Sequence, residues 1–583
     1  MIRKLARSIR QYKRDTILTP LSMTLEVIME VLLPIIMADL IDNGISAGNS
    51  AIVWRDGLLL AGVSILSLLS GLLGGVFGAR ASSGFARNLR HDMYYRLQDY
   101  SFSNIDKFST SSLITRLTTD VSNVQNAFQM LIRMAARSPL MLIFSAIMAF
   151  SVNARLALIF LCVVQFLAVG LTYVATHAHP VFRKVFKTYD SLNNVVQENV
   201  RGMRVVKSFV REDYEDKKFE DISGQVCTLF TKAERIIALN SPLMQFAMYA
   251  CTLLISWFGA KFILSSVGQP NAMTTGELNS LLTYSMQILG SLMMLSFMFV
   301  MLTISRASGE RICEVLDEQS DLHSPENART EISDGSVDFD GVSFSYAGNK
   351  KRLCLEDVNL HIHSGKTIGI VGGTGSSKST LVQLIPRLYD ATEGVVKVGG
   401  HDVKEYDLEA LRNSVAMVLQ KNVLFSGTIR ENLRWGNPDA TDEELVAACR
   451  LAQAHEFIEG FPQGYDTFIE QGGSNVSGGQ KQRLCIARAI LKKPKILILD
   501  DSTSAVDTRT DALIREGMKK IIPGTTTFII AQRVSSVMDA DKIIVLDGGR
   551  VNGFGTHDEL MQTNEIYREV YTSQTKGGGD YDE

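Results

Sequence analysis

A glycine-rich turn between a predicted strand and a predicted helix has the residues needed to hold a nucleoside triphosphate. Residues 367–371 (TIGIV) form a continuous apolar strand that runs into residues 372–380 (GGTGSSKST). In such a P-loop, backbone N–H groups surround the phosphates, a lysine supplies positive charge to the β and γ oxygens, and a serine hydroxyl ligates Mg²⁺. The last two roles are predicted for Lys378 and Ser379. Phosphate contacts are predicted for Gly372, Thr374, Gly375, Ser376, Ser377 and Thr380.

One position departs from the usual form of this loop. The residue before the lysine is usually glycine, and here it is Ser377. A side chain must therefore fit where the backbone approaches the phosphates closely. We expect nucleotide binding to persist, with an altered affinity.

A second motif places acidic groups next to the same nucleotide. Residues 496–500 (ILILD) are an apolar strand that ends in Asp500, as in a Walker B strand whose aspartate faces Mg²⁺. An ATPase with this machinery next carries a Glu that orients the attacking water, and later a His that contacts the γ-phosphate. This chain has Asp501 and Gln532 at those positions. The shorter Asp carboxylate would stop about 1 Å or more from the water, and a positioned base contributes typically about 10²–10⁴-fold. The sequence predicts ATP binding with impaired hydrolysis.

The chain that carries these motifs is too long for one domain and too apolar for a purely soluble enzyme. It has 583 residues, of which 46% are hydrophobic, and its mean hydropathy is +0.10. Its net charge of −3 gives no indication of nucleic-acid binding. A helix needs about 20 residues to cross about 30 Å of hydrocarbon. Candidate spans are residues 16–40, 56–79, 136–153, 156–176, 240–265 and 277–303.

The distribution of basic residues predicts how these six spans are oriented. An even number of spans places both termini on one side of the membrane. The N-terminus is basic, the segments 80–135 and 177–238 carry many Lys and Arg, and the segment 265–278 carries none. By the positive-inside rule, both termini and the soluble half lie in the cytoplasm. We therefore predict a multi-pass protein of the plasma membrane without a cleavable signal peptide.

The two long basic segments are predicted to be helices that extend about 35–40 Å into the cytoplasm. Each contains a polar break, at residues 101–108 and 209–216, where a short connecting helix would sit. From about residue 334 the pattern changes to soluble α/β, beginning with alternating apolar and polar residues at 337–346. The predicted fold is an all-α six-helix transmembrane domain (1–305), a linker (306–333), an α/β P-loop nucleotide-binding domain (334–572) and a polar tail (573–583).

Further motifs resemble those of one family. Residues 475–483 (NVSGGQKQR) are similar to the signature motif of ATP-binding cassette (ABC) transporters, with Val476 in place of the usual Leu. Gln420 resembles the family's Q-loop residue, residues 504–507 (SAVD) its D-loop and Tyr346 its adenine-stacking aromatic. Together with the six spans, the chain resembles a type I/type IV exporter half-transporter. The resemblance implies ATP and Mg²⁺ as cofactors, with Mg²⁺ held by Ser379, Gln420 and Asp500. It also implies nucleotide contacts from Tyr346, Gln420, Ser477, Gly478, Gly479, Gln480 and Asp507.

The resemblance further implies a dimer with two composite sites. ATP lies between the P-loop of one subunit and the signature motif of the other, and each intracellular tip reaches the partner's cassette. One site contains this chain's P-loop with Asp501, Gln532 and Gln420 as catalytic residues, and the other contains its residues 477–480. The two altered residues match the pattern of heterodimeric exporters, so the predicted partner is a second half-transporter with an intact Glu and His. The alternatives are a conservative change with little effect and a homodimeric exporter with slow turnover.

The transported compound is less well defined by the sequence. Glu26 and Glu30 share one face of the first span, where uncompensated charge is costly. Facing a central cavity they would attract cationic amphipathic compounds; the alternative is hydrogen bonding between helices. Met286 and Met293 suit an adaptable pocket, and the alternative is ordinary packing or lipid contact. The favoured function is ATP-driven export of drugs or lipid-like compounds. The alternative class is a nucleotide-gated regulatory or channel-like membrane protein.

Overall fold

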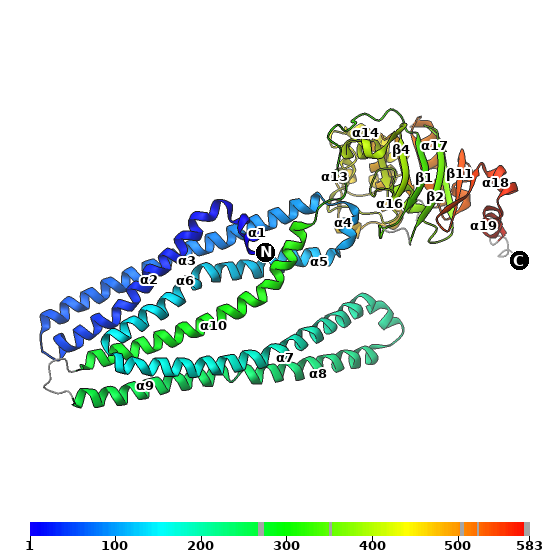
Figure 1. Ribbon diagram of the computed structural model, residues 1–583. Helices are drawn as coiled ribbons and strands as arrows, with labels where there is room; N and C mark the ends of the chain where they lie inside the picture. The colour runs from blue at the N-terminus through cyan, green and yellow to red at the C-terminus, as the bar shows by residue number, and fades with distance from the viewer. Residues whose placement is uncertain (266–272, 349–351, 502–506, 522–523, 577–583) are drawn as a thin grey trace. The chain divides into compact units, whose positions relative to one another are not determined.

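The chain folds into two compact units, each described separately below (Figure 1). A computed structural model describes residues 1–265, 273–348, 352–501, 507–521 and 524–576. The helical unit comprises residues 1–98 and 110–317. The α/β unit comprises residues 99–109 together with the described residues from 318 onward.

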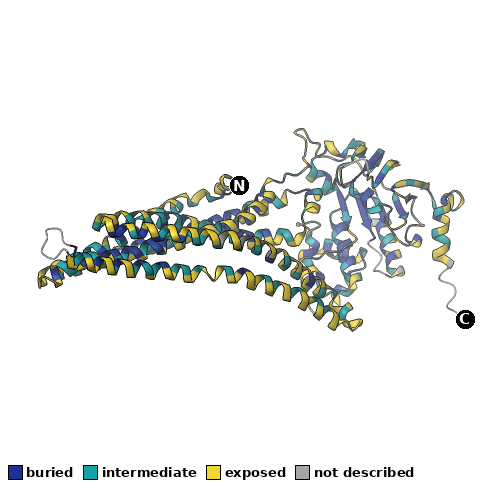
Figure 2. Ribbon diagram, turned by 60° about the horizontal axis from the view of Figure 1, so that its bottom comes forward, coloured by how far each residue is buried: buried dark blue, intermediate teal, exposed yellow. Residues whose placement is uncertain are grey.

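The helical unit confirms the six predicted spans. In the described residues, six helices are long and apolar enough to cross a membrane: Ile2–Ile45, Ser50–Gln98, Thr110–Val152, Ala154–Ser208, Glu212–Ser265 and Thr275–Asp317. Their elements are α1 (Ile2–Leu5), η1 (Ala6–Tyr12), α2 (Lys13–Asp39), η2 (Leu40–Ile45), α3 (Ser50–Gln98), α5 (Thr110–Thr115), η3 (Arg116–Asp120), α6 (Val121–Val152), α7 (Ala154–Ser208), α8 (Glu212–Ile237), α9 (Asn240–Ser265) and α10 (Thr275–Asp317). Many apolar side chains on their outer faces are exposed, as expected where lipid would cover them (Figure 2).

Small residues allow α2 and α3 to pack closely. A Cβ atom at Gly74 would meet the Met23 Cε at 2.2 Å, and one at Gly78 would meet the Thr19 Cγ2 at 3.3 Å. Without a hydrophobic driving force between helices in lipid, such close backbone approach is a main source of packing energy. The Tyr284 hydroxyl on α10 donates to the Val31 carbonyl on α2 at 2.9 Å. These contacts join the first two spans and the last into one bundle.

The two polar breaks differ in structure. The first contains a separate short helix, α4 (Phe102–Lys107), as predicted, because Ser101 and Asn104 form a capping box at its start. The second break has no short helix: residues 209–211 form a turn with Val210 at φ 50°, and α8 begins at Glu212. The acidic residues that follow suit the first turn of a helix, so they continue into α8 instead of forming an element of their own.

Two helices extend into the segments that were predicted to be a linker and a polar tail. Helix α10 continues to Asp317, so the first part of the predicted linker, residues 306–317, is helical. The C-terminal helix α19 (Glu565–Lys576) includes the first residues of the predicted tail. Residues 306–317 keep apolar residues at helical spacing among their charges, and such an amphipathic pattern supports a helix, whereas residues 573–576 are polar and continue the amphipathic helix that precedes them.

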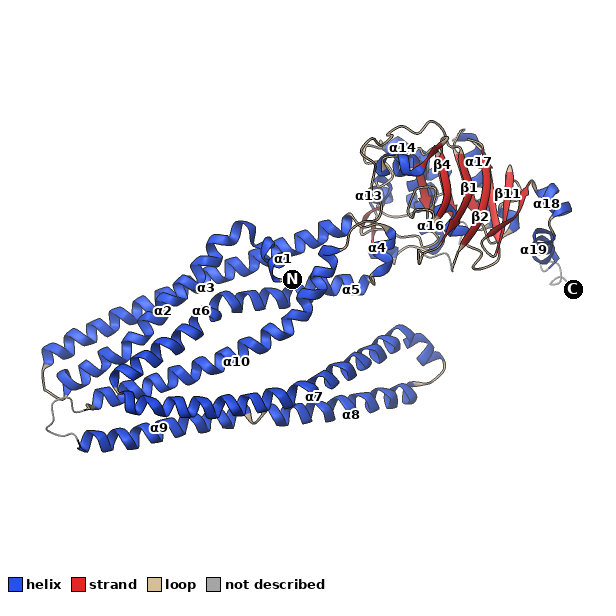
Figure 3. Cartoon of the chain, viewed as in Figure 1, coloured by secondary structure: helices blue, strands red, loops and turns tan. Residues whose placement is uncertain are grey.

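The α/β unit contains two main sheets (Figure 3). The antiparallel sheet has the order β2-β1-β4-β5, and the mainly parallel sheet has the order β12-β11-β3-β10-β9-β6. The strands are β1 (Val337–Phe344), β2 (Leu355–Ile362), β3 (Thr367–Gly372), β4 (Glu393–Val398), β5 (His401–Asp402), β6 (Val415–Val418), β7 (Gly427–Thr428), β8 (Phe468–Ile469), β9 (Ile496–Asp500), β10 (Thr526–Ile530), β11 (Lys542–Asp547) and β12 (Arg550–Gly555). The helices are α4, α11 (Lys378–Gln383), α12 (Leu408–Ser414), α13 (Ile429–Arg434), α14 (Asp442–Leu451), α15 (His455–Glu459), α16 (Gly478–Leu491), α17 (Thr508–Ile521), α18 (His557–Thr563) and α19, with short 3-10 turns η4 (Val403–Glu405), η5 (Gly464–Asp466), η6 (Gln471–Gly473) and η7 (Val534–Ser536).

Parallel pairing brings three loops to the same edge of the larger sheet. Strand β10 lies between β3 and β9, with Ile530 opposite Ile370 on one side and Asp500 on the other. The segments that follow these strands therefore leave the sheet side by side at its carboxyl edge. Ligand sites of open α/β sheets form at this edge.

Candidate functional site

The P-loop connects β3 to α11 and carries the predicted phosphate contacts. The Lys378 Nζ donates to the carbonyl oxygens of Gly372 and Gly373 at 2.9 and 2.8 Å, so the ammonium lies over the loop. Burial lowers the pKa of Lys378, against the opposing effect of the two nearby carboxylates. The ammonium group thus lies on the loop that is predicted to surround the phosphates.

Ser377 adopts the left-handed conformation that makes glycine usual at this position. Its φ and ψ are 69° and 26°. A residue with a Cβ atom in this region costs roughly 1–2 kcal/mol compared with a right-handed conformation. This backbone cost is separate from the predicted crowding of the phosphates by the Ser377 side chain.

Ser377→Gly is expected to raise the stability of the α/β unit by about 0.5–1 kcal/mol and to tighten nucleotide binding. The gain is smaller than the strain itself, because glycine also has more conformational freedom in the unfolded chain. Thermal unfolding and titration with a fluorescent ATP analogue measure both effects. Ser376→Gly is the matched control, since Ser376 is not among the residues with positive φ. A lower midpoint for Ser377→Gly would show that the serine side chain itself stabilises the loop.

Ser379 and Asp500, two of the three predicted Mg²⁺ ligands, are hydrogen-bonded to each other, whereas the third, Gln420, lies beside Asp501. The Ser379 hydroxyl donates to the Asp500 Oδ1 at 2.9 Å, which joins α11 to the end of β9. Asp500 is 4% exposed, and burial raises the pKa of its carboxyl group. A hydroxyl and a carboxylate at this separation are hard oxygen donors of the kind that hold Mg²⁺ on a bound phosphate. The residues present therefore fit this ion, and Mg²⁺ would neutralise charge on the β- and γ-phosphates.

The three predicted catalytic residues lie together. The Gln532 Nε2 donates to the Asp501 Oδ2 at 2.7 Å, and the Gln420 Nε2 lies 3.5 Å from the same oxygen. Asp501 has φ 49°, and its backbone N–H donates to the Ile530 carbonyl at 3.0 Å. The Gln532 amide therefore occupies one acceptor position of the Asp501 carboxylate, which is the group that would have to orient the attacking water.

The predicted adenine-stacking residue lies in an aromatic cluster. The Tyr346 ring contacts those of Phe344 and Tyr389, with centroids 4.8 and 5.2 Å apart, and its hydroxyl lies 3.1 Å from the Thr380 Oγ1. The Tyr389 hydroxyl donates to the Asp106 Oδ2 on α4 at 2.7 Å. Sequence analysis missed Tyr389 and Asp106, because 283 positions separate them and neither belongs to a recognised motif.

The signature residues form the start of a helix. Ser477 is the N-cap of α16, and it forms a capping box with Gln480: its hydroxyl accepts from the Gln480 N–H at 3.3 Å, and its own N–H donates to the Gln480 Oε1 at 2.9 Å. Gly478 and Gly479 form the first turn and leave the backbone N–H groups accessible. Such an exposed helix N-terminus binds anions.

The D-loop falls only in part within the described residues. Residues 504–506 lie outside them. The described Asp507 accepts a hydrogen bond from the Thr510 N–H at 2.9 Å, and this contact lowers the pKa of its carboxyl group. Asp507 thereby caps the start of α17.

The two membrane carboxylates lie beside an arginine on α6. The Arg137 NH2 lies 2.9 Å from the Glu30 Oε1 and 3.4 Å from the Glu26 Oε1. Glu26 packs against Gly71, where a Cβ atom would meet its carboxyl carbon at 3.2 Å. Arg133 on α6 also acts electrostatically on Glu26, so two arginines offset the two glutamates. Sequence analysis missed this pairing, although Arg137 is a charge within a predicted span and so required a partner.

The two methionines proposed as substrate contacts are both exposed in the single chain. Met286 is 55% exposed and Met293 is 51% exposed, and both lie on α10. Exposure of this extent is compatible with a cavity wall, a subunit interface or lipid.

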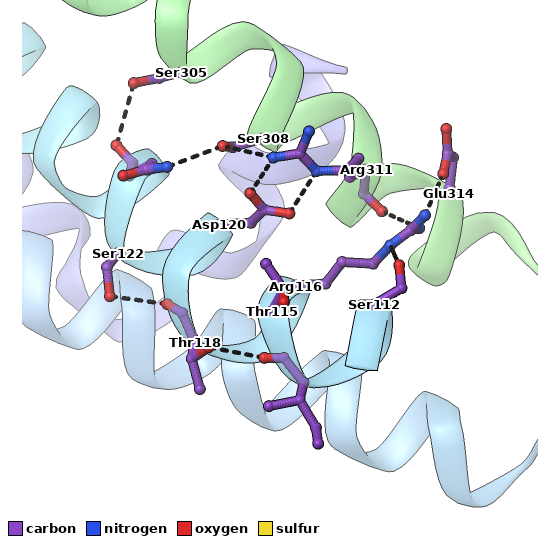
Figure 4. Close-up of polar contacts among 12 residues, drawn as sticks. Ser112, Thr115, Arg116, Thr118, Asp120, Ser122, Ser305, Ser308, Arg311 and Glu314 are labelled. Atoms are coloured by element: carbon purple, nitrogen blue, oxygen red, sulfur yellow. Dashed lines mark hydrogen bonds and ion pairs between the residues drawn. The ribbon is translucent and has the colours of Figure 1, made fainter. Parts of the chain in front are cut away.

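A second charged cluster joins η3 to the C-terminal part of α10 (Figure 4). Both side-chain oxygens of Asp120 accept from the Arg311 guanidinium, one of them at 2.7 Å. Asp120 is 1% exposed. Arg116 donates to the Arg311 carbonyl at 2.8 Å and pairs with Glu314 at 2.9 Å. The π-helical geometry of η3 widens the helix at the residues that make these contacts.

Comparisons with known proteins agree with these features. The family model for the ABC transporter transmembrane region matches residues 16–292, and the ABC transporter model matches residues 355–504. The ABC transporter ATP-binding protein YfiB of Bacillus subtilis (strain 168) is 37% identical over 552 residues, which covers 95% of each chain. YgaD of the same organism, whose name gives multidrug export as a provisional role, is 31% identical over 97% of this chain and 98% of its own.

A solved structure resembles the whole chain. The structure of a bacterial Atm1-family ABC exporter with ATP bound matches with a TM-score of 0.79 and 25% identity. The match covers 97% of this chain and 98% of that chain.

Proposed function

The chain belongs to the ABC transporters as an exporter half-transporter with one transmembrane and one nucleotide-binding domain, and from this we propose an asymmetric role for it. We propose that it pairs with a second half-transporter that has an intact catalytic Glu and His. Its own P-loop site binds ATP and Mg²⁺ but hydrolyses slowly. Its signature motif completes the partner's site, where most hydrolysis takes place.

The contact between Gln532 and Asp501 carries this proposal. A catalytic carboxylate must accept a hydrogen bond from water, and here a neutral amide donates to it at 2.7 Å. The amide also lacks the positive charge that a protonated histidine would bring to the γ-phosphate. Both changes reduce stabilisation of the charge that develops in phosphoryl transfer. The signature motif, by contrast, keeps its serine, both glycines and a complete capping box.

Surfaces exposed in the single chain support assembly with a partner. At the tip of the α7–α8 hairpin, Phe209 is 72% exposed and Val210 is 81% exposed. The α/β unit has a groove of about 320 Å³ whose lining includes Val423, Phe425 and Trp435. The last two rings stack with centroids 4.1 Å apart. We propose that the hairpin tip of each subunit docks in this groove of the other, because both surfaces expose large apolar side chains to water in the single chain.

The proposed substrates are small amphipathic compounds such as drugs or lipids. Glu26 and Glu30 are the proposed contacts for cationic compounds, and Arg133 and Arg137 beside them offset their charge, so the expected preference for cations is weak. The provisional multidrug role of YgaD agrees with this class. The proposed transporter lies in the plasma membrane, with both termini and the nucleotide-binding domain in the cytoplasm, and it moves these compounds out of the cytoplasm.

Restoring both altered residues tests the impaired site. In the full chain purified without a partner, wild-type turnover is expected to lie below the typical range of about 1–100 s⁻¹, although ATP and Mg²⁺ bind. In the pair assembled with a partner whose own P-loop lysine is replaced by Ala, only this chain's site can turn over. There Asp501→Glu with Gln532→His is expected to raise turnover by about 10²-fold, and more than either single change, since a base and a charged γ-phosphate contact return together. A steady-state phosphate-release assay measures this. Fast turnover by the wild type, or no gain in the double variant, would contradict the proposal.

A further inference from the structure

The C-terminal helix makes two hydrogen bonds to the loop that carries Gln532. The Gln574 Nε2 donates to the Gln532 carbonyl at 2.9 Å, and the Val534 N–H donates to the Gln574 Oε1 at 2.8 Å. One side-chain amide thus pairs with the backbone on both sides of Arg533, as the backbone of an adjacent strand would. Gln574 lies on α19, and its partners follow β10 and begin η7.

The sequence of α19 directs Gln574 to this loop. Tyr567 is fully buried, and Val570 and Tyr571 pack against the same apolar core. Gln574 lies seven positions after Tyr567 and therefore on the same face of the helix. The Tyr567 hydroxyl lies 2.7 Å from the Nδ1 of His557 on α18, which anchors the start of α19. The helix is thus fixed by its packing, and Gln574 extends from the end of the packed face.

In the described residues, other backbone hydrogen bonds of this loop lie on either side of the two groups that pair with Gln574, and on the later side the Val534 carbonyl accepts from the N–H groups of Val537 and Met538. The Ala531 N–H donates to the Ile370 carbonyl at 3.3 Å in the last contact with the sheet, and the Ser536 N–H donates to the Arg533 carbonyl within η7. Between these contacts, Gln574 bonds to both Gln532 and Val534. The Gln532 side chain that starts from this backbone reaches the Asp501 carboxylate.

We propose that Gln574 is a positioning residue for the switch loop of this half-transporter. By pairing with the backbone at 532 and 534, it holds the Gln532 side chain toward Asp501 and toward the γ-phosphate position. The C-terminal helix therefore sets how well this chain's site distinguishes ATP from ADP. This inference rests on the proposed function, in which Gln532 contacts the γ-phosphate of a nucleotide on the same chain's P-loop.

Gln574→Leu tests the inference in the full chain purified without a partner. It removes both hydrogen bonds and keeps a helix-forming residue of similar size. Hydrogen exchange of the peptide that contains Val534 is expected to become faster, because its N–H loses its acceptor. The ratio of ADP to ATP dissociation constants is expected to fall about two- to tenfold, the range that one lost hydrogen bond gives. Ser573→Leu is the control, since Ser573 is the adjacent exposed position.

Two further variants separate positioning from simple stabilisation. Gln574→Glu keeps an acceptor for the Val534 N–H and loses the donor to the Gln532 carbonyl. Hydrogen exchange of the Val534 peptide should therefore stay slow, while the ratio of ADP to ATP dissociation constants falls. In a Gln532→Ala background, Gln574→Leu should change the ratio no further, because the two residues act as one unit. Additive effects of Gln532→Ala and Gln574→Leu on this ratio would overturn the inference. So would an unchanged ratio in a Gln574→Leu chain that only unfolds at a lower temperature. Hydrogen exchange of the Val534 peptide is measured without nucleotide, so unchanged exchange in Gln574→Leu would refute this inference and leave the proposed function intact. A wild-type ratio of ADP to ATP dissociation constants in Gln532→Ala would refute the proposed function as well.

Discussion

Replacing Ser477 by Ala is expected to lower the ATPase of the assembled pair about 10²–10³-fold while ATP affinity at this chain's own P-loop stays unchanged. Ser477 caps α16 and is exposed at a helix N-terminus whose backbone N–H groups can receive an anion. In the proposed pair that anion is the γ-phosphate held by the partner's P-loop. The contact strengthens as charge develops during phosphoryl transfer, so its loss lowers turnover more than binding.

A control must exclude the structural cost of losing a helix cap, which is about 1 kcal/mol. Thr441→Ala serves this purpose, because Thr441 caps α14 through the same kind of capping box, formed with Glu444. It is expected to change ATPase less than threefold, since it lies outside the nucleotide motifs. Equal losses in the two variants would show that Ser477 acts only on folding.

Arg311→Ala is expected to destabilise the helical unit by about 3 kcal/mol. The substitution leaves the Asp120 carboxylate, which is 1% exposed, without the guanidinium that binds both its oxygens (Figure 4). An uncompensated buried charge costs more than the ion pair itself contributes. Thermal unfolding of the purified chain in detergent, followed by circular dichroism, measures the loss.

Arg306→Ala provides the matched control on the same helix. Arg306 pairs with Glu310 one turn away, and both side chains are more than half exposed. Such a pair contributes typically less than about 0.5 kcal/mol. Similar midpoints for the two variants would mean that water reaches Asp120 and that the cluster does not hold η3 to α10.

Local motifs were predictable because neighbouring residues in the sequence determine them. The P-loop, Walker B strand and capped start of α16 each depend on a few adjacent residues, and the structure places them at the predicted strand and helix ends. The six spans were predictable for a related reason, since length and apolarity alone define them. The left-handed backbone at Ser377 was not predicted, because the sequence indicated only a side chain close to the phosphates.

Contacts between distant elements were not predictable in the same way. Arg137 beside Glu30, Tyr389 on Asp106 and Gln574 on the switch loop each join segments whose approach depends on the whole fold. The short helix predicted within residues 209–216 is missing for a different reason. The acidic residues of this break form the first turn of α8, and a polar break alone does not show which outcome a sequence takes.

Comparing Ser477→Ala with Asp501→Ala in the same membranes tests the asymmetric account most directly. Both variants are assembled with the same partner, and their substrate-stimulated ATPase rates are measured side by side. We expect Asp501→Ala to lower the rate less than about threefold, well below the 10²–10⁴-fold loss of a working base. Ser477→Ala should lower it far more. If Asp501→Ala proves the more damaging change, this chain holds the main catalytic site and the asymmetric assignment is wrong.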